Sequence, residues 1–496
     1  MTSTADQPAM VARLESPGED EPNPYLLGMY APVHTEIDAD DLEVIGEIPR
    51  DLSGVYLRNG PNPRFPVQGR YHWFDGDGMV HGIHFENGRA RYRNRWVRTK
   101  AFRAESEAGR ALWTGVMENP RANPFGNTHG LNLKDNANTD VIFHRGRLLT
   151  TWYLCGSPYV LDPLSLETLG AEDFLGTLTG DMMAHPKIDE RTGELFWFDF
   201  GPRPPYLRYG VVSADGRVTH TTDVELPGPR MPHDMAITEN YAVLMDLPLI
   251  QDPVAARQGR HRIIFERSMP ARFGVLPRYG HGADVRWFEA SSCYVYHVVN
   301  AWEEGDELVL DVCRVRRPQP HAQAQTPLAK MLSYLRLDAQ LHRYRFNLRT
   351  GACSEEARDD ANTEFPTVDS RMVGRPSRYA YHVHISNEST LAFDGLVRYD
   401  NVTGARAEHF FGPGRWGSEA PFAPRDGAIG NPASSEDDGY LVTFVQDERE
   451  GRSEVDVFDA GDIAAGPVAR VLLPQRVPLG FHATWVRADQ LRASRS

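Results

Sequence analysis

The amino-acid sequence predicts an all-β fold, because three features recur along the chain. Short runs of β-branched and aromatic residues, such as 194–200 and 440–445, alternate with polar turns almost to the C-terminus. Tight-hairpin dipeptides (Asn-Gly, Asp-Gly, Thr-Gly) occur in the turns at 85–89, 189–194, 213–217, 347–351 and 400–404. Helical periodicity is scarce. Hairpin modules in series are typical of a β-propeller, and an array of two-sheet sandwiches is the alternative.

One segment carries a clear helix signal. It begins at Thr326-Pro327, a capping residue followed by a proline at the first helical position. The residues after it place four apolar side chains on one face: Leu328, Met331, Leu332 and Leu335. We expect this face to pack on the β domain. Contact with a membrane surface, from which an apolar substrate could be drawn, is the alternative interpretation.

The domain organisation follows from composition. Residues 1–22 are acidic, contain proline and lack hydrophobic periodicity, so we expect a disordered or loosely attached arm. Residues 23–490 have a globular composition and are predicted to form a single catalytic propeller domain, with residues 491–496 as a C-terminal tail. Large β folds often run long as one domain, so the length of 496 residues agrees with this division.

Charge and hydropathy narrow the classes of partner. The chain has 68 acidic and 53 basic residues, a formal net charge of −15, and no Lys/Arg cluster, which argues against binding a nucleic acid. The first residues have neither a basic nor an apolar signal region, and no apolar run approaches the roughly 20 residues that cross a bilayer. We expect a cytoplasmic protein with at most peripheral membrane contact.

The cysteines do not form a recognisable site. Cys155, Cys293, Cys313 and Cys353 include no C-x-x-C pair and stand mostly in strand-like runs, where a thiol behaves as a small hydrophobic group. Four cysteines in so long a chain are too few for a disulfide framework. We interpret them as reduced structural residues.

Four histidines are the candidate metal ligands. His297 lies in the strand-like run 294–303, where a buried imidazole needs a partner for each ring nitrogen. His185, His233 and His482 stand in comparable settings. His185, His233 and His297 follow one another at intervals of 48 and 64 residues, which is about one propeller blade plus a loop. Inner strands of different blades all face the propeller axis, so these histidines can meet there. Four neutral imidazoles suit a divalent ion with open positions, while a closed zinc tetrahedron is the alternative.

Five stretches resemble the signature segments of the carotenoid cleavage oxygenases, a family that includes apocarotenoid oxygenases and stilbene-cleaving dioxygenases. They are residues 54–63 (GVYLRNGPNP), 74–81 (FDGDGMVH), 184–187 (AHPK), 297–303 (HVVNAWE) and 480–482 (GFH). The resemblance runs from about Asn23 to Trp485. It implies a seven-bladed β-propeller, with loop and helix inserts forming a cap over an axial Fe(II) site bound by His185, His233, His297 and His482.

The same resemblance implies roles for residues around the metal. In the family, three glutamates accept the remaining ring N–H bonds of the ligand histidines, and Glu364 and Glu419 match two of them; solvated loop carboxylates are the alternative interpretation. The third position is Tyr153, which we expect to accept a bond from His233 or, alternatively, to turn its ring toward the substrate. Trp152 stands where hydroxystilbene-cleaving members tend to have lysine, which argues against phenolate activation. Trp152 and Tyr153 are also our candidates for the substrate pocket.

The predicted function is an Fe(II)-dependent oxygenase that uses O2 to cleave a conjugated C=C bond into two carbonyl products. A small apolar alkene is the expected partner, with an apocarotenoid as the first choice and a stilbene or phenylpropene as the second. An alternative enzymatic function is ester cleavage and isomerisation with the iron as a Lewis acid, as in one retinoid branch of the family. In another class, the propeller would be a binding module without catalysis.

Overall fold

The computed structural model describes residues 22–118, 123–124, 132–154, 156–252, 254, 262–315, 318 and 324–493. The arm predicted for residues 1–22 lies outside these ranges except for its last residue, and so does Cys155. At the other end, α5 (Ala488–Ala493) crosses the boundary predicted at residue 490.

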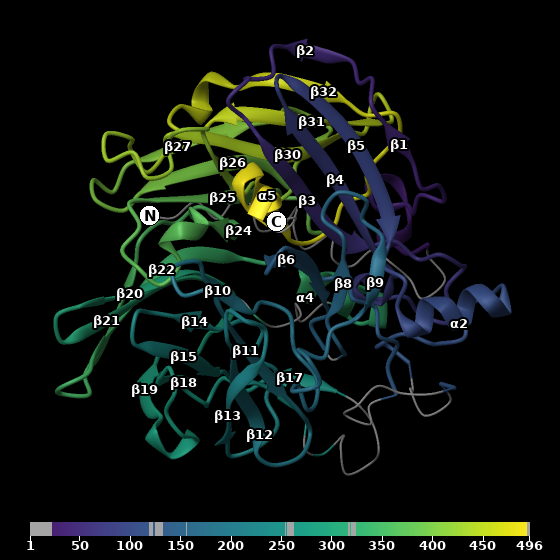
Figure 1. The fold of residues 1–496 in the computed structure, drawn as a ribbon. Helices are drawn as coiled ribbons and strands as arrows, with labels where there is room; N and C mark the ends of the chain where they lie inside the picture. The colour runs from purple at the N-terminus through teal and green to yellow at the C-terminus, as the bar shows by residue number, and fades with distance from the viewer. Residues whose placement is uncertain are drawn as a thin grey trace, which may run out of the picture.

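Seven antiparallel sheets surround a central axis, which confirms the predicted seven-bladed propeller (Figure 1). Four sheets, written from the inner strand outward, are β6 (Asp140–His144), β7 (Arg147–Thr151), β8 (Tyr159–Leu161), β9 (Thr168–Ala171); β10 (Lys187–Asp189), β11 (Glu194–Phe200), β12 (Tyr206–Val212), β13 (Val218–Glu225); β14 (Ala236–Ile237), β15 (Tyr241–Asp246), β18 (Ala271–Pro277), β19 (Arg286–Ala290); and β20 (Tyr294–Glu304), β21 (Glu307–Val315), β22 (Ala339–Asn347), β23 (Cys353–Ala357). A small ribbon, β16 (Leu249–Gln251) with β17 (Ile263–Phe265), is inserted between β15 and β18.

The remaining three sheets contain the segments that close the ring. They are β24 (Thr363–Thr367), β25 (Tyr379–Ile385), β26 (Phe393–Asp400), β27 (Arg406–Phe410); β28 (Arg415–Trp416) and β29 (Phe422–Pro424) on β30 (Gly439–Asp447), then β31 (Arg452–Asp459), β32 (Pro467–Leu472), β2 (Val44–Gly46); and β33 (Ala483–Arg487), β3 (Gly54–Pro61), β4 (Gly78–Glu86), β5 (Arg89–Trp96), β1 (Asp38–Ala39). The C-terminal strand β33 thus joins N-terminal strands, and the N-terminal strand β2 joins the last blade. The N-terminal and C-terminal parts of the chain therefore close the ring in two neighbouring sheets, through the pairs β33–β3 and β2–β32.

The hairpin turns lie where their dipeptides predict them. Asn87 and Gly88 connect β4 to β5 with φ of 52° and 73°, the left-handed region that a tight hairpin turn requires. Four further turns carry a positive-φ glycine between consecutive strands: Gly193, Gly216, Gly351 and Gly404. The turn residues therefore determine where consecutive strands of each blade begin and end.

The predicted helix is present as α4 (Pro327–Leu335), and its apolar face packs inside the protein. The Thr326 hydroxyl accepts the N–H of Ala329 at 3.1 Å, as a capping residue does. Met331, Leu332 and Leu335 are buried, which stabilises the helix by about 1.5–3 kcal/mol for each side chain. A second helix, α2 (Lys100–Ala108), was not predicted from the sequence. No described helix is long and apolar enough to span a membrane.

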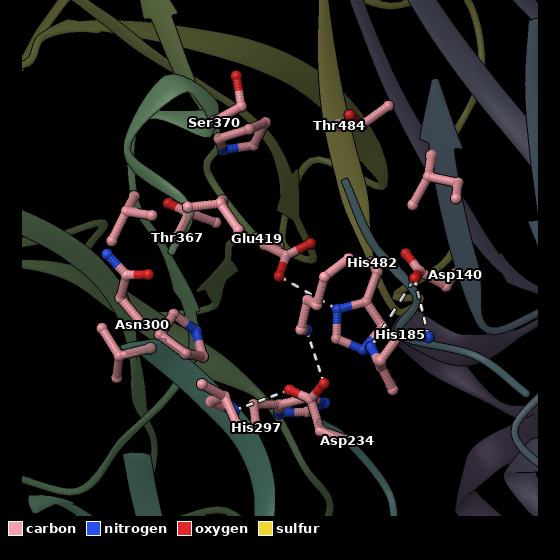
Figure 2. A pocket seen from close by; sticks show the side chains of 18 of the residues that line it. Asp140, His185, Asp234, His297, Asn300, Thr367, Ser370, Glu419, His482 and Thr484 are labelled. Atoms are coloured by element: carbon pink, nitrogen blue, oxygen red, sulfur yellow. Dashed lines mark hydrogen bonds and ion pairs between the residues drawn. The ribbon is translucent and has the colours of Figure 1, made fainter. Parts of the chain in front are cut away.

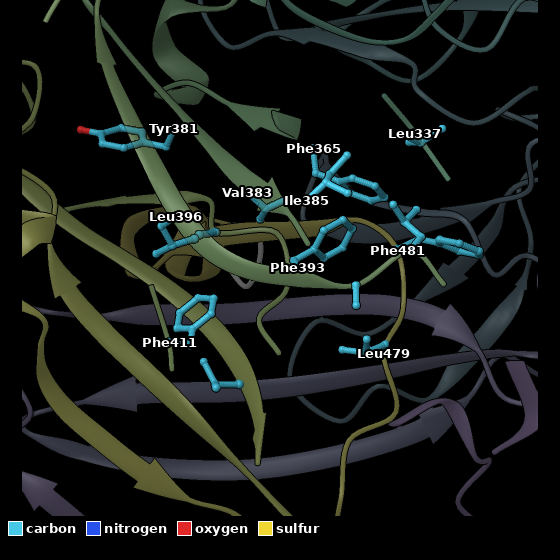
Figure 3. Packing of buried hydrophobic residues seen from close by; sticks show 14 of the residues in the cluster. Leu337, Phe365, Tyr381, Val383, Ile385, Phe393, Leu396, Phe411, Leu479 and Phe481 are labelled. Carbon is cyan, nitrogen blue, oxygen red and sulfur yellow. The ribbon is translucent and has the colours of Figure 1, made fainter. Parts of the chain in front are cut away.

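An apolar cluster links the helix and loop inserts to the inner strands (Figure 3). Leu332 of α4 belongs to it together with Tyr25 and Trp73 of the short helices η1 (Pro24–Leu26) and η3 (Trp73–Asp75). Phe365 and Phe481 belong to the same cluster and stand next to the axis. The inserts therefore form a cap on the side of the axis where these two phenylalanines lie.

Candidate metal centre

The four predicted histidines reach the axis from four different blades. His185, His233 and His482 each stand just before an inner strand, respectively β10, β14 and β33, and His297 lies within the inner strand β20. Their ring centroids are 4.5–5.1 Å apart between neighbouring members. One nitrogen from each ring lies within 4.8 Å of the others. The structure thus brings together residues that are almost 300 positions apart in the sequence.

These imidazoles fit a metal ion. All four are buried, and the Nε2 atoms of His185 and His297 have no hydrogen-bond partner among the described residues, which is costly unless a ligand satisfies them. Burial lowers the pKa of His185, His233 and His297 well below the ordinary value, so their lone pairs are free at neutral pH. Clustered imidazole nitrogens, three of them in rings that burial keeps neutral, are the donor set of a transition-metal site.

Both predicted glutamates hold a histidine ring from behind. Glu364 Oε2 lies 2.6 Å from His297 Nδ1, and Glu419 Oε1 lies 3.1 Å from His482 Nδ1. Each Nδ1–H donates to its carboxylate, which leaves the Nε2 lone pair facing the axis. Burial alone would lower the pKa of His482, but the Glu419 carboxylate raises it above the ordinary value. Burial raises the pKa of the Glu364 carboxyl well above its usual range, and the hydrogen bond from the Phe365 N–H opposes this rise.

Two aspartates that the sequence reasoning missed fix the backbone at the histidines. Asp140 Oδ2 accepts the N–H of His185 at 3.1 Å, and Asp234 Oδ2 accepts the N–H of Val298 at 2.8 Å. His185 needs this support because its φ is 68°, a conformation that costs a non-glycine residue about 1–3 kcal/mol. Asp234 directly follows His233, so adjacency could have suggested it, whereas nothing local points to Asp140.

The hydrogen bond expected between Tyr153 and His233 is not formed. The Tyr153 hydroxyl instead pairs with the hydroxyl of Tyr294, which donates to the carbonyl of Met231 at 2.6 Å. His233 Nδ1 is buried without a hydrogen-bond partner, while the two rings pack with centroids 4.2 Å apart. Tyr153 therefore contacts His233 with its ring face, because Tyr294 takes its hydroxyl away.

Aromatic rings cover one side of the four histidines. Phe365 lies 4.8 Å from the ring of His297 and 4.6 Å from that of His482 between centroids, and Tyr296 lies 5.0 Å from that of His233. Phe365 directly follows Glu364, a proximity that the sequence displays. This side offers an apolar, π-rich surface next to the unpartnered nitrogens.

The ring of Phe74 extends this aromatic surface, and Trp152 holds it there. The ring centroids of Phe74 and Tyr153 are 5.8 Å apart. Trp152 is buried, and its indole N–H donates to the carbonyl of Phe74 at 3.1 Å. The predicted pocket residue Trp152 therefore supports the aromatic surface from behind.

Two cavities approach the site. A polar cavity of about 230 Å³ is lined in part by His185, His297 and His482 (Figure 2). An apolar cavity of about 160 Å³ is lined by residues that include Leu154 and Phe200, whose ring centroid lies 6.1 Å from that of Tyr153. The four-histidine cluster therefore has a polar approach and an aromatic one.

A seven-bladed propeller with a buried four-histidine cluster on its axis defines a candidate axial metalloprotein. The chain matches the sequence model of the retinal pigment epithelial membrane protein family over residues 30–487. It is 38% identical to a carotenoid 9,10(9',10')-cleavage dioxygenase from Phaseolus vulgaris, over 95% of this chain and 91% of that protein. It is 34% identical to isoeugenol monooxygenase from Pseudomonas nitroreducens, over 94% of this chain and 98% of that protein.

Solved structures give the same result. Lignostilbene dioxygenase from Pseudomonas brassicacearum superposes with a TM-score of 0.83 at 32% identity, covering 94% of this chain and 98% of that one. A variant of apocarotenoid oxygenase from Synechocystis superposes with a TM-score of 0.81 at 27% identity, covering 93% and 98%. The chain belongs to the retinal pigment epithelial membrane protein and carotenoid cleavage oxygenase family. It is an oxygenase of the carotenoid cleavage type.

The position of Tyr153 leads to a test of its ring and hydroxyl separately. Tyr153→Phe keeps the ring contact with His233 and removes only the bond to Tyr294, so we expect metal content within about 20% of the unaltered protein, because that hydroxyl touches no histidine nitrogen. Tyr153→Ala removes the ring and should lower metal retention. Metal per protein, measured by elemental analysis after gel filtration, decides this. A loss of metal in Tyr153→Phe would show that the hydroxyl acts on the site.

Proposed function

We propose that this protein binds Fe(II) through His185, His233, His297 and His482 and uses O2 to cleave a conjugated C=C bond of an apocarotenoid, giving two carbonyl products. The observation that carries the proposal is the cluster of four buried imidazoles with an aromatic surface on one side. Both atoms of O2 enter the products, one for each carbonyl, so the reaction balances without a further reductant.

Four imidazoles can hold iron or zinc, and membership of an oxygenase family supports iron with open positions over a closed zinc site. His185, His233, His297 and His482 come from four blades around the axis and would hold the ion there. When bound there, Fe(II) would supply binding and one-electron activation of O2. Glu364 and Glu419 would keep the His297 and His482 rings oriented and increase their basicity through the Nδ1–H bonds.

The aromatic surface would hold and orient the alkene. The rings of Phe365, Tyr153 and Tyr296 pack against the histidine rings, with centroids 4.2–5.0 Å apart, and would exclude water from that side. The apolar cavity beside Tyr153, lined by Leu154, Phe200 and other apolar residues, would accept the rest of a long polyene. An extended apolar tail with its scissile bond near His233 suits these two surfaces together.

A phenylpropene or stilbene is the second candidate, and Tyr296 is the observation that favours it. Its side chain is partly accessible, and its hydroxyl has no hydrogen bond to another described residue, so it could pair with a phenolic group on a smaller substrate. Isoeugenol monooxygenase and lignostilbene dioxygenase are among the similar proteins. Trp152 argues against activation of such a phenol, because its indole N–H already donates a hydrogen bond to the carbonyl of Phe74.

The experiment is a product analysis with a matched substrate panel. The Fe(II)-loaded protein is incubated under ¹⁸O2 with an apocarotenoid, a hydroxystilbene and a phenylpropene, and the products are identified by mass spectrometry. We expect two labelled carbonyl fragments, with the apocarotenoid turned over fastest. Faster turnover of the phenylpropene or stilbene would reassign the substrate. Products without the label, formed without O2 consumption, would support Lewis-acid chemistry and overturn the proposal.

A further inference from the structure

The polar cavity at the histidines is the axial channel of the propeller. Its lining comes from the inner strands of all seven blades, β6, β10, β14, β20, β24, β29 and β33. Three of these strands start next to His185, His233 and His482, so they run along the axis away from the candidate metal centre. Among the lining residues Ser370 is solvent-exposed and Thr484 is half-buried, whereas His185 and His297 are buried. The channel therefore joins the protein surface to the histidine cluster.

The channel differs from the aromatic side because carboxylates stand among its apolar lining residues. Asp140, Asp234 and Glu419 line it, with Lys187 as the single ammonium group, and Figure 2 shows these carboxylates close to the histidine rings. Lys187 Nζ lies 2.6 Å from Asp234 and neutralises it. Carboxylates outnumber the ammonium group three to one, which favours cations inside the channel. Phe365, Tyr153 and Tyr296, which form the aromatic surface, do not line this channel.

A hydrated divalent cation can use only one of these two approaches. Removing the hydration shell of a divalent cation costs far more free energy than contacts with an apolar wall provide. Such a cation also prefers oxygen ligands while its water molecules are exchanged. The aromatic side offers rings and aliphatic groups, whereas the channel offers carboxylates and the side-chain oxygens of Asn300, Thr367 and Ser370. At its inner end, the buried Nε2 atoms of His185 and His297 have no protein partner.

We propose that the axial channel is the route by which the metal ion enters and leaves the four-histidine site, separate from the approach of the alkene. The inference rests on the proposed function for the presence of the metal, and adds how it is exchanged. A hydrated divalent cation passes Ser370 and Thr484, is attracted by Asp140, and exchanges its water for imidazole at His185 and His297.

The rim of the channel allows a charge test that leaves the site itself unchanged. Ser370→Asp and Ser370→Lys alter the charge at an exposed position, with Ser354→Asp and Ser354→Lys on the outer strand β23 as matched controls. Thr484→Trp narrows the channel, with Thr221→Trp on the exposed face of β13 as its control. The readouts are the rate of Co2+ uptake by chelator-stripped protein and the rate of Fe(II) release from the loaded protein to a coloured ferrous chelator.

We expect uptake by Ser370→Asp to exceed that by Ser370→Lys by about tenfold at low ionic strength, and the difference to shrink in high salt. Thr484→Trp should slow both uptake and release, while the control variants keep the rates of the unaltered protein. Unchanged rates in the Ser370 pair and in Thr484→Trp, with normal binding of one Co2+, would overturn the route alone. Failure of the unaltered protein to bind Co2+ would overturn the metal centre and the route together.

Discussion

His297→Ala is expected to lose most of its metal and to reduce alkene cleavage by at least about 100-fold. The substitution removes one imidazole donor and leaves Glu364, which is fully buried, without its partner at 2.6 Å. Glu364 would keep only the N–H of Phe365, and losing one hydrogen bond of a buried carboxyl costs about 1–3 kcal/mol of folding free energy, so thermal stability of the metal-free protein should fall as well. Elemental analysis, turnover and a thermal melt of the same preparation measure the three effects.

His342→Ala is the matched control for this prediction. His342 is buried to a similar degree, at 7% exposed against 5% for His297, but lies in β22 away from the axis. Its removal should cost stability without loss of metal. If His297→Ala retains a full complement of metal and normal turnover, His297 is not a ligand and the four-histidine assignment has to be redrawn.

Glu364→Gln is expected to weaken the metal site by about 10–100-fold in affinity or turnover. Oε2 of Glu364 accepts both His297 Nδ1–H and the N–H of Phe365. An amide oxygen can accept the same bonds but carries no charge, and a charge-assisted bond is about twice as strong as a neutral one. The His297 ring would stay oriented but become a poorer donor. Competition with a chelator of known affinity measures the change in metal binding.

The control for the charge removed by Glu364→Gln is Glu356→Gln on the exposed outer strand β23, which should leave metal affinity unchanged. Glu364→Ala separates orientation from charge, because it removes the acceptor altogether. We expect a larger loss in Glu364→Ala than in Glu364→Gln. Equal metal affinity in Glu364→Gln and the unaltered protein would return Glu364 to a purely structural role.

Local signals in the sequence predict most of the fold. The Asn87-Gly88 turn and the Thr326 cap each depend on residues a few positions apart, and both are found as predicted. Local signals do not predict the number of blades, because hairpins in series are also compatible with β-sandwiches. It was the resemblance to a family that separated the two arrangements.

The candidate site was predictable where it depends on residue type and hidden where it depends on distant contacts. The setting and spacing of the four histidines gave only a weak signal among eighteen, and the resemblance to a family singled them out. By contrast, the contact between Asp140 and the backbone of His185 crosses 45 residues, and no local pattern encodes it. Tyr153 was given the wrong partner for the same reason. Its hydroxyl pairs with that of Tyr294, which is far away in the sequence and becomes a neighbour only when the propeller ring is assembled.

The double closure of the ring makes the four-histidine cluster depend on a strand that pairs across almost the whole described chain. His482 stands immediately before β33, the strand that joins the C-terminal part of the chain to β3. A nascent chain that has already made six blades still lacks one of the four imidazoles and the strand that would place it. Pairing so distant in sequence is slow to form. A metal held by all four histidines would therefore require β33 to be in place, and chains that lack this strand should be distinguishable by the absence of the metal.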